Sequence, residues 1–137
     1  MANLYSMFTF DAATVLKAAG PITASIDGAI LDLGEGLFDG FLVLDVSAVE
    51  VDSGNEIYTI SVEGSSVPPM SSLSVCLAKK TLGNVVAPMD NPTGAGRFVV
   101  PFRNEENGVL KRYVRLSTAV VGTVVTGINF FAFLAKR

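Results

Sequence analysis

Acidic side chains come closer than any others in this chain to a spacing that could do chemistry. Two carboxyl groups on either side of a glycosidic bond suffice for glycoside hydrolysis, and Glu35 with Asp39, or Glu105 with Glu106, are close enough in sequence to form such a pair. Both pairs fall in Gly- or Asn-rich segments typical of turns, where carboxylates are usually solvated. We therefore interpret them as surface charges.

The chain has no histidine, which removes Ser-His-Asp and Cys-His nucleophile systems together with the commonest metal ligand. A single cysteine, Cys76, excludes an intramolecular disulfide and a multi-cysteine zinc site. Its neighbours Leu73, Val75 and Leu77 predict a buried and inert thiol. The sequence therefore predicts that the protein is not an enzyme and has no catalytic residue, metal site or cofactor.

Two weaker binding patterns are present. The acidic segments 52–56 and 90–91 supply oxygen atoms that suit calcium, but neither has the spacing of a dedicated calcium loop. Tyr58 and Tyr113 could form a platform on which a sugar stacks, although tryptophan, which serves best for this purpose, is absent. A carbohydrate-binding β-sandwich module is therefore the alternative function that the sequence leaves open.

Composition indicates a protein that makes contacts with other molecules. The 137 residues suit one domain with its own core. Half of them are hydrophobic and the mean hydropathy is +0.49, so there is more apolar surface than a small monomer easily hides. We expect self-association as a dimer or trimer, or docking on a protein partner. The first residues lack the pattern of a secretory signal, so we expect synthesis in the cytoplasm without export.

Charge is distributed unevenly along the chain. Residues 1–63 contain ten acids and one base, whereas residues 64–137 contain three acids and nine bases. We expect strands from the two halves to pair and cancel these charges within one fold; the alternative interpretation is an acidic and a basic surface that complement each other in an assembly. Because the basic residues are scattered, nucleic acid is not an expected partner.

Turn-forming residues recur at short intervals, and the segments between them are rich in Val, Ile, Thr and aromatic residues, which favour strands. In residues 57–63, Tyr58, Ile60 and Val62 alternate with less apolar residues, as in a half-buried strand. We also predict a tight reversal at Asn107-Gly108. The predicted strands are residues 29–33, 41–51, 57–63, 73–79, 97–102, 110–120 and 123–135. This pattern predicts an all-β, antiparallel sandwich like a jelly roll.

Residues 116–135 are uncharged and long enough to cross a membrane as a helix. Their β-branched and aromatic residues, interrupted by Gly122 and Gly127, fit strands better. We therefore predict two strands joined by a hairpin near Gly122 and no association with a membrane.

The N-terminal segment is unusually apolar for a chain end. Only residues 11–20 have a helix-like composition, with an acidic start and a final Gly-Pro, and they suffice for two turns. We divide the chain into an N-terminal arm, residues 1–20, and a sandwich domain, residues 21–137. The arm is expected to attach either to its own sheet or to a neighbouring subunit, and the sequence leaves both open.

The last predicted strand is apolar on both faces. Ile128, Phe130, Ala132 and Leu134 fall on one side, and Asn129, Phe131 and Phe133 on the other, so a second layer must cover the latter. Asp45 shares a face with Phe41 and Val43, and we expect Arg112 or Arg115 to pair with it. The candidate protein–protein contact residues are Leu4, Tyr5, Met7, Phe8, Phe10, Phe131 and Phe133.

Several segments appear in a familiar order. Behind the apolar N-terminal segment come residues 29–34, 41–46 and 58–64, then Arg112-Tyr-Val-Arg-Leu116 and a last strand over residues 130–137. In order and spacing these segments resemble the jelly-roll capsid cement, or decoration, proteins of tailed bacteriophages. The resemblance implies a viral structural protein on the outer surface of the capsid, where it bridges neighbouring copies of the major capsid protein and stiffens the shell. It implies no catalytic residue.

Overall fold

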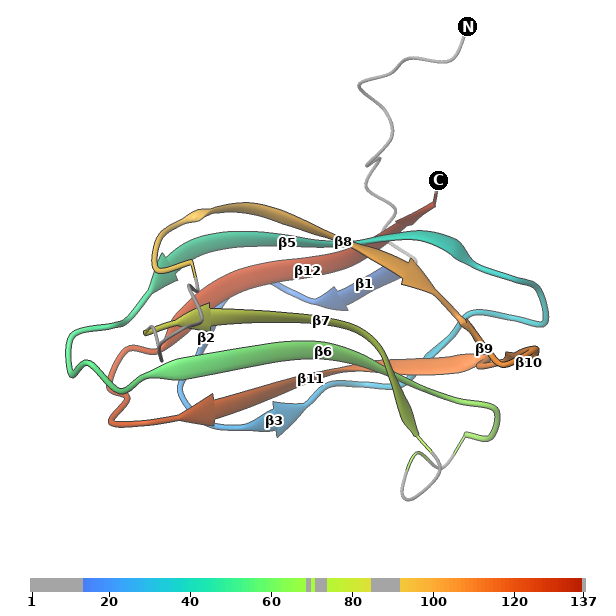
Figure 1. Ribbon diagram of the computed structural model, residues 1–137, viewed down its shortest axis with the longest axis horizontal. Coiled ribbons are helices and arrows are strands. Elements are labelled where there is room, and N and C mark those ends of the chain that lie inside the picture. Colours follow the sequence, from blue (N-terminus) through green and yellow to red (C-terminus); the bar gives the residue numbers. More distant parts are fainter. Residues whose placement is uncertain (1–13, 69, 71–73, 85–91, 137) are drawn as a thin grey trace, which may run out of the picture.

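A computed structural model describes residues 14–68, 70, 74–84 and 92–136 of the chain. Figure 1 shows two layers of strands stacked face to face. Sheet A contains β1 (Val15–Lys17), β2 (Pro21–Ile22), β5 (Asp39–Val49), β8 (Gly96–Arg103) and β12 (Ile128–Lys136). Sheet B contains β3 (Ile26–Asp27), β4 (Leu31–Asp32), β6 (Ile57–Ser65), β7 (Val75–Gly83) and β11 (Tyr113–Val121).

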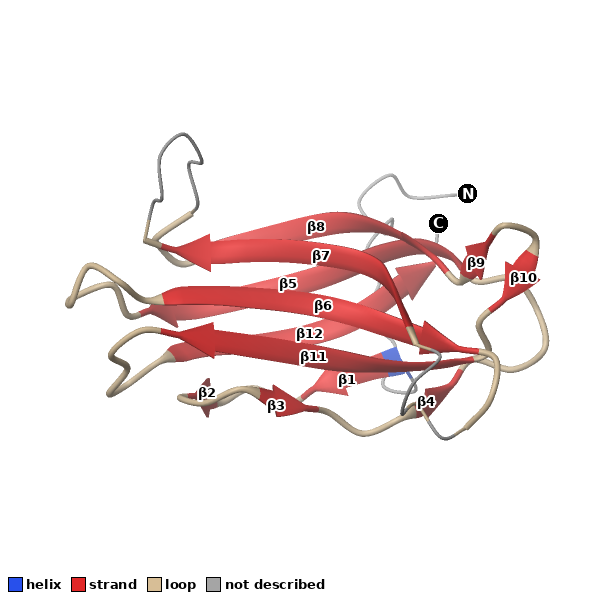
Figure 2. Ribbon diagram, turned by 60° about the horizontal axis from the view of Figure 1, so that its bottom comes forward, coloured by secondary structure: helices blue, strands red, loops and turns tan. Residues whose placement is uncertain are grey.

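The strands are arranged as a jelly roll. Sheet A has the order β1-β12-β5-β8, with β2 also on β12, and sheet B has the order β3-β11-β6-β7, with β4 also on β11. All the pairings are antiparallel. The chain changes sheets between β2 and β3, β4 and β5, β5 and β6, β7 and β8, β8 and β11, and β11 and β12 (Figure 2). Two interleaved Greek keys of this kind define the jelly-roll sandwich, and the predicted all-β sandwich is confirmed.

Alternating side chains from both sheets fill the core. Tyr58, Ile60 and Val62 of β6 are fully buried, which confirms the half-buried strand predicted from their spacing. On β12, the predicted inner face of Ile128, Phe130, Ala132 and Leu134 also belongs to this core. Apolar faces from two sheets therefore meet in one hydrophobic layer, and burial of this area is the main stabilising contribution to the fold.

Residues 116–135 form two strands, as predicted, but the strands do not form a hairpin pair. β11 lies in sheet B and β12 in sheet A, so the turn between them crosses from one layer to the other. Gly122 has a φ of +105°, and a Cβ atom there would collide with the carbonyl oxygen of Asn55. In the described part of the chain there is no helix both long and apolar enough to span a membrane.

The predicted tight turn at Asn107-Gly108 is present, with φ values of 52° and 80°. It joins β9 (Glu105–Glu106) to β10 (Val109–Leu110), a small ribbon of its own, because β8 and β11 lie in different sheets. A positive φ at both central residues suits a type I′ hairpin.

The helix expected over residues 11–20 is wrong where the structure describes this segment. Val15–Lys17 form β1, which pairs with β12, with Val15 opposite Phe133. A helix of two turns is marginal in isolation, so the hydrogen bonds and packing offered by an adjacent strand outweigh local propensity. Residues 15–17 of the expected arm thus lie within sheet A, and residues 1–13 lie outside the described residues.

The prediction of a buried Cys76 is also wrong, because the side chain is exposed. The pairing of β7 with β6 shifts between Val62 opposite Ala78 and Glu63 opposite Cys76, which leaves Leu77 as an extra residue. Such a β-bulge reverses the alternation of faces. Leu77 therefore packs against the core in place of Cys76.

Candidate interaction surface

Pairing in sheet A aligns apolar residues on the face that points away from sheet B. Residues directly opposite each other in neighbouring strands share a face. The middle of the outer face of sheet A, between the Asp39–Arg103 pair and the ends of the strands, therefore consists of three cross-strand rows: Pro101, Phe41 and Ala135; Val99, Val43, Phe133 and Val15; and Arg97, Asp45 and Phe131. We use the name outer face of sheet A for these ten residues together. Eight of the ten, including Pro101, are apolar, and the other two are Arg97 and Asp45.

Part of this face is buried as completely as the core. Val43 is 0% exposed, and Phe133 and Ala135 are each 1% exposed. They form a hydrophobic cluster separate from the one between the sheets, with the half-buried side chains of Val15, Phe41 and Phe131 packed against it. The rings of Phe131 and Phe133 are tilted, with centroids 5.7 Å apart. The prediction that β12 is largely apolar on both faces is confirmed for its described residues.

An ion pair closes one end of the cluster. Arg97 Nε and Nη2 donate to the two carboxylate oxygens of Asp45 at 2.6 and 2.8 Å. The hydrogen bond to Asp45 raises the pKa of Arg97. The guanidinium carbon also lies 5.8 Å from the centre of the Phe133 ring. A bidentate ion pair of this kind fixes the position of Arg97 beside the apolar residues.

Asp45 was expected to pair with Arg112 or Arg115, and this expectation is wrong. Arg97 stands directly opposite Asp45 in the neighbouring strand, whereas the other two arginines lie at or near β11 in sheet B. There, Arg112 Nε is 2.7 Å from Asp32, and Arg115 is 3.5 Å from Asp27 and 3.2 Å from Glu63. The hydrogen bond from Arg112 lowers the pKa of Asp32.

These ion pairs join acids of residues 1–63 with bases of residues 64–137. The interpretation that opposite charges of the two halves cancel within one fold is thereby confirmed for these residues. The sharper interpretation, in which complementary charged surfaces direct assembly, gains no support from them.

The sequence-predicted contact residues divide into two groups. Phe131 and Phe133 lie together on the outer face of sheet A. Sequence reasoning did not include Val15, Phe41, Val43 and Ala135 among the contact residues, although Phe41 and Val43 were already placed on one face with Asp45. The alternation of Phe41 and Val43 with the core residues of β5 was the sequence pattern that could have identified these two as contact residues. The other predicted residues, Leu4, Tyr5, Met7, Phe8 and Phe10, lie outside the described residues.

The buried carboxylate of Glu50 holds the turn between β11 and β12. Glu50 Oε1 accepts hydrogen bonds from the backbone N–H groups of Val125, Thr126 and Gly127 at 2.7–2.8 Å. The hydrogen bonds from Gly127 and Val125 lower the pKa of Glu50. A carboxylate held by this many donors is occupied in fixing backbone, so its role is structural.

Glu56 has a comparable structural role. Burial alone would raise its pKa, but the N–H groups of Ser53 and Asn55 donate to its carboxylate and hold the pKa below its usual value. Within the described residues, no group of three or more His, Cys, Asp or Glu side chains is arranged to hold a metal ion.

Tyr58 cannot serve in a sugar-stacking platform. Its side chain is fully buried, its hydroxyl donates to the Glu50 carbonyl oxygen at 2.9 Å, and burial raises its pKa to about 12. Tyr113 remains half-buried beside Arg112. The platform predicted from the two tyrosines therefore does not form.

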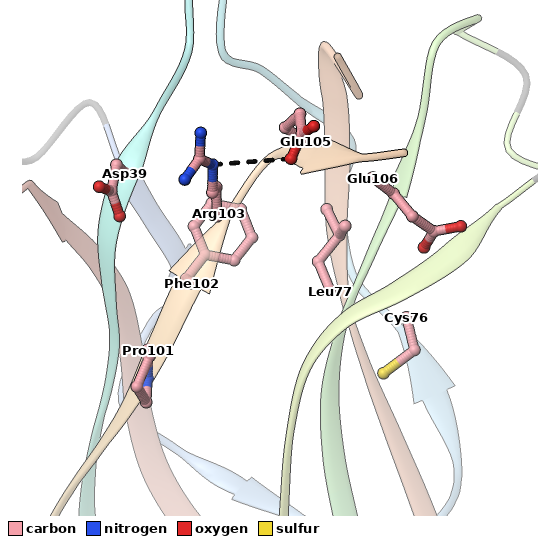
Figure 3. A pocket seen from close by; sticks show the side chains of 8 residues that line it. All are labelled: Asp39, Cys76, Leu77, Pro101, Phe102, Arg103, Glu105 and Glu106. Carbon is pink, nitrogen blue, oxygen red and sulfur yellow. Dashed lines mark ion pairs between the residues drawn. The ribbon is translucent and has the colours of Figure 1, made fainter. Parts of the chain in front are cut away.

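A pocket opens between the edge strands β7 and β8 (Figure 3). Cys76 lies on its β7 side, and Arg103 of β8 forms an ion pair of 3.7 Å with Glu105. The thiol donates to the carbonyl oxygen of Ala78 at 3.5 Å, and none of the side chains that line the pocket is a histidine. The pocket thus lacks the imidazole that activates the thiol in Cys-His systems.

The two edge strands beside this pocket are poorly suited to accept another strand. Pro101 of β8 has no N–H group to offer, and β7 carries Lys79 and Lys80. Both devices are typical of edges protected against strand addition. Contacts with partners are therefore better made through a face of the sandwich than through these edges.

No known protein-family model matches the chain, and no curated protein matches it significantly in sequence. Function must therefore be argued from the fold and its surfaces. Of these, the outer face of sheet A departs furthest from an ordinary solvated surface.

Proposed function

We propose that the protein is a viral structural protein, a capsid decoration protein that binds the outer surface of a phage head and bridges neighbouring copies of the major capsid protein. The observation that carries the proposal is the apolar outer face of sheet A in a sandwich that already has a complete core. On this face Val99 is 37% exposed, and Phe41 and Phe131 are half-buried. Accessible apolar surface gathered on one side is typical of a protein that works by making contacts.

Two further observations support a structural role over catalysis. The buried carboxylates of Glu50 and Glu56 are occupied by backbone N–H groups, and the pocket beside Cys76 contains no histidine to activate the thiol. Jelly rolls occur among capsid and lectin domains, so the fold is compatible with the resemblance seen in the sequence, although a fold by itself does not determine a function.

A shell lattice would make modest contacts sufficient. An interface of ordinary size buries about 800 Å² on each partner. Because a shell repeats each contact many times, and because each decoration protein bridges more than one subunit, avidity raises the effective affinity well above that of a single contact.

The proposal is tested by co-sedimentation with empty, expanded phage heads after native mass measurement of the free protein. Val99 is 37% exposed on the outer face of sheet A, and Val121 is 61% exposed on the opposite side of the molecule, on β11. We expect Val99→Glu to weaken attachment by at least about tenfold, as for a charge introduced into an apolar contact, and Val121→Glu to attach normally. Normal attachment of Val99→Glu, or no attachment of the unmodified protein, would contradict the proposal.

Deletion of residues 1–10 is a second test. We expect the shortened chain to lose attachment or self-assembly while the sandwich stays folded, as judged by circular dichroism. Retention of both properties would remove the N-terminal segment from the proposed contact.

A further inference from the structure

A cavity opens between the two sheets along one long edge of the sandwich, where β1 and β2 of sheet A lie near β3 and β11 of sheet B (Figure 2). Its volume is about 270 Å³. Leu16 and Leu116 of the buried core form part of its wall, and Ile26, which is 56% exposed, lies where the cavity meets solvent. The link between β1 and β2 contributes only the small residues 18–20, so no large side chain of this link fills the space.

Thr118 places a hydroxyl group in this wall. The residue is 2% exposed and belongs to β11, where it follows Val114 and Leu116 on the face that points toward sheet A. Ile26 pairs with Thr118 and therefore shares this face. Among the described residues, every side-chain polar atom that is completely enclosed has a hydrogen-bond partner, whereas the Thr118 hydroxyl forms no hydrogen bond. The hydroxyl is therefore open to the cavity and available to a ligand.

Lys17 is the one charged side chain among the described residues that line the cavity, and its ammonium group has no donor to spare. Nζ donates to the carbonyl oxygens of Ala18, Gly20 and Phe130, each at 2.8 Å. A lysine ammonium group has three N–H donors, so these three carbonyl oxygens use all of them. A carboxylate in the cavity would find no cationic donor, and burial of a carboxylate without a partner is costly. The wall therefore favours an uncharged ligand.

We propose that the cavity binds a small neutral alcohol, with the apolar part of the ligand between Leu16 and Leu116 and its hydroxyl hydrogen-bonded to Thr118. An apolar cavity of about 150 Å³ holds one benzene molecule, so a cavity of about 270 Å³ accommodates a phenyl ring or a short alkyl chain that carries a hydroxyl group. A purely apolar occupant, such as an aliphatic side chain of another protein, would leave the Thr118 hydroxyl unpaired. This site is separate from the outer face of sheet A and does not depend on attachment to a shell.

Titration with benzyl alcohol, followed by methyl NMR of the full-length protein, tests the proposal. We expect saturable shifts of the methyl groups of Leu16, Ile22 and Leu116, with a dissociation constant of about 1 mM. Leu82, a core residue outside the cavity wall, should not shift. Benzoate, which has the same ring with a carboxylate, should bind at least about tenfold more weakly. NOEs from the CH₂ protons of benzyl alcohol to the Thr118 methyl group should locate the ligand in the unmodified protein.

The role of the hydroxyl is tested with Thr118→Val, in which a methyl group of nearly the same size replaces it. We expect this variant to weaken the binding of benzyl alcohol about fivefold relative to toluene, which lacks the hydroxyl group, because one hydrogen bond is lost. In the matched control Ser117→Ala, the hydroxyl that is removed lies on the outer face of sheet B and donates to Asp27 at 2.8 Å. The preference for benzyl alcohol over toluene should not change in this control.

Three results would overturn the proposal. They are the absence of saturable shifts at the cavity wall, benzoate binding as tight as that of benzyl alcohol, and an alcohol preference that Thr118→Val leaves unchanged. If Thr118→Val does not fold, the NOEs in the unmodified protein decide, since their absence from the Thr118 methyl group would place the ligand elsewhere.

Discussion

The outer faces of the two sheets differ in chemistry although the sheets are built alike. On sheet B, Lys79, Ser61, Ser117 and Asp27 stand side by side across four strands, and Arg115 joins the next row. On sheet A, the corresponding rows contain mostly apolar side chains and one ion pair. Sheet B thus has an apolar inner face and a polar outer face, whereas sheet A is largely apolar on both faces.

The difference lies chiefly in one inner strand of each sheet, β11 in sheet B and β12 in sheet A. In β11, buried Val114, Leu116 and Thr118 alternate with more accessible residues, whereas β12 places Phe131 and Phe133 on the side opposite its core residues. A strand with apolar residues on both faces is stable only between two layers. In the described residues, sheet B therefore carries its apolar side chains chiefly on one face, whereas sheet A carries them on both.

The largest expected effect comes from removing an aromatic ring from the outer face of sheet A. Phe133→Ala should lower the free energy of unfolding by about 3–4 kcal/mol, the usual effect of truncating a buried phenylalanine. Ser117→Ala on the outer face of sheet B should change it by less than about 1 kcal/mol. Urea denaturation measures both, and equal effects would show that the two faces do not differ in burial.

The second-largest effect on stability is expected at Glu50, because its carboxylate holds the turn that connects β11 in sheet B to β12 in sheet A. Its folded-state pKa is lowered, so its stabilising contribution is complete above its unfolded pKa of about 4.3 and is lost as the pH falls through the folded pKa. Glu50→Gln should therefore be less stable at neutral pH, with a difference from the unmodified protein that shrinks below about pH 4.3. Thermal unfolding across pH measures this.

The control for that experiment is Glu35→Gln, since the Glu35 side chain is 91% exposed. It should unfold like the unmodified protein at every pH. A Glu50→Gln variant whose deficit stays constant down to pH 2 would contradict the assigned role of the carboxylate.

Ion pairs on the two outer faces should differ by a smaller amount. Arg115 and Glu63 have side chains 21% and 25% exposed, whereas Arg97 and Asp45 are 49% and 38% exposed. Because solvent screens the more exposed pair, double-mutant cycles should give about 1 kcal/mol for Arg115–Glu63 and about 0.5 kcal/mol for Arg97–Asp45. The reverse order would show that packing of Arg97 against Phe133 outweighs exposure.

The smallest effect is expected at Cys76. Because the β-bulge at Leu77 turns its thiol outward, Cys76→Ser should change the free energy of unfolding by less than about 0.5 kcal/mol. The native thiol should react with a disulfide reagent at nearly the rate found in denaturant. Strong protection in the native state would contradict the exposed position.

Local patterns in the sequence were sufficient to identify most strands. Alternation in residues 57–63, the turn residues Asn107-Gly108 and the β-branched composition of residues 116–135 each predicted the correct local structure. Three local predictions were wrong: a helix that includes residues 15–17, a buried Cys76 and a hairpin pair joined near Gly122. Each concerns a place where pairing with another strand decides the outcome.

What the sequence determined by itself is the periodicity of each segment, and with it the β-class, the separate strands and the two apolar faces of β12. Which strands became neighbours was decided only in the tertiary structure. A period of two says which side chains share a face, but not which distant strand supplies the hydrogen bonds. For this reason the pairing of Asp45 with Arg97, and the meeting of Val43 with Phe133, followed from the register between β5 and its neighbours.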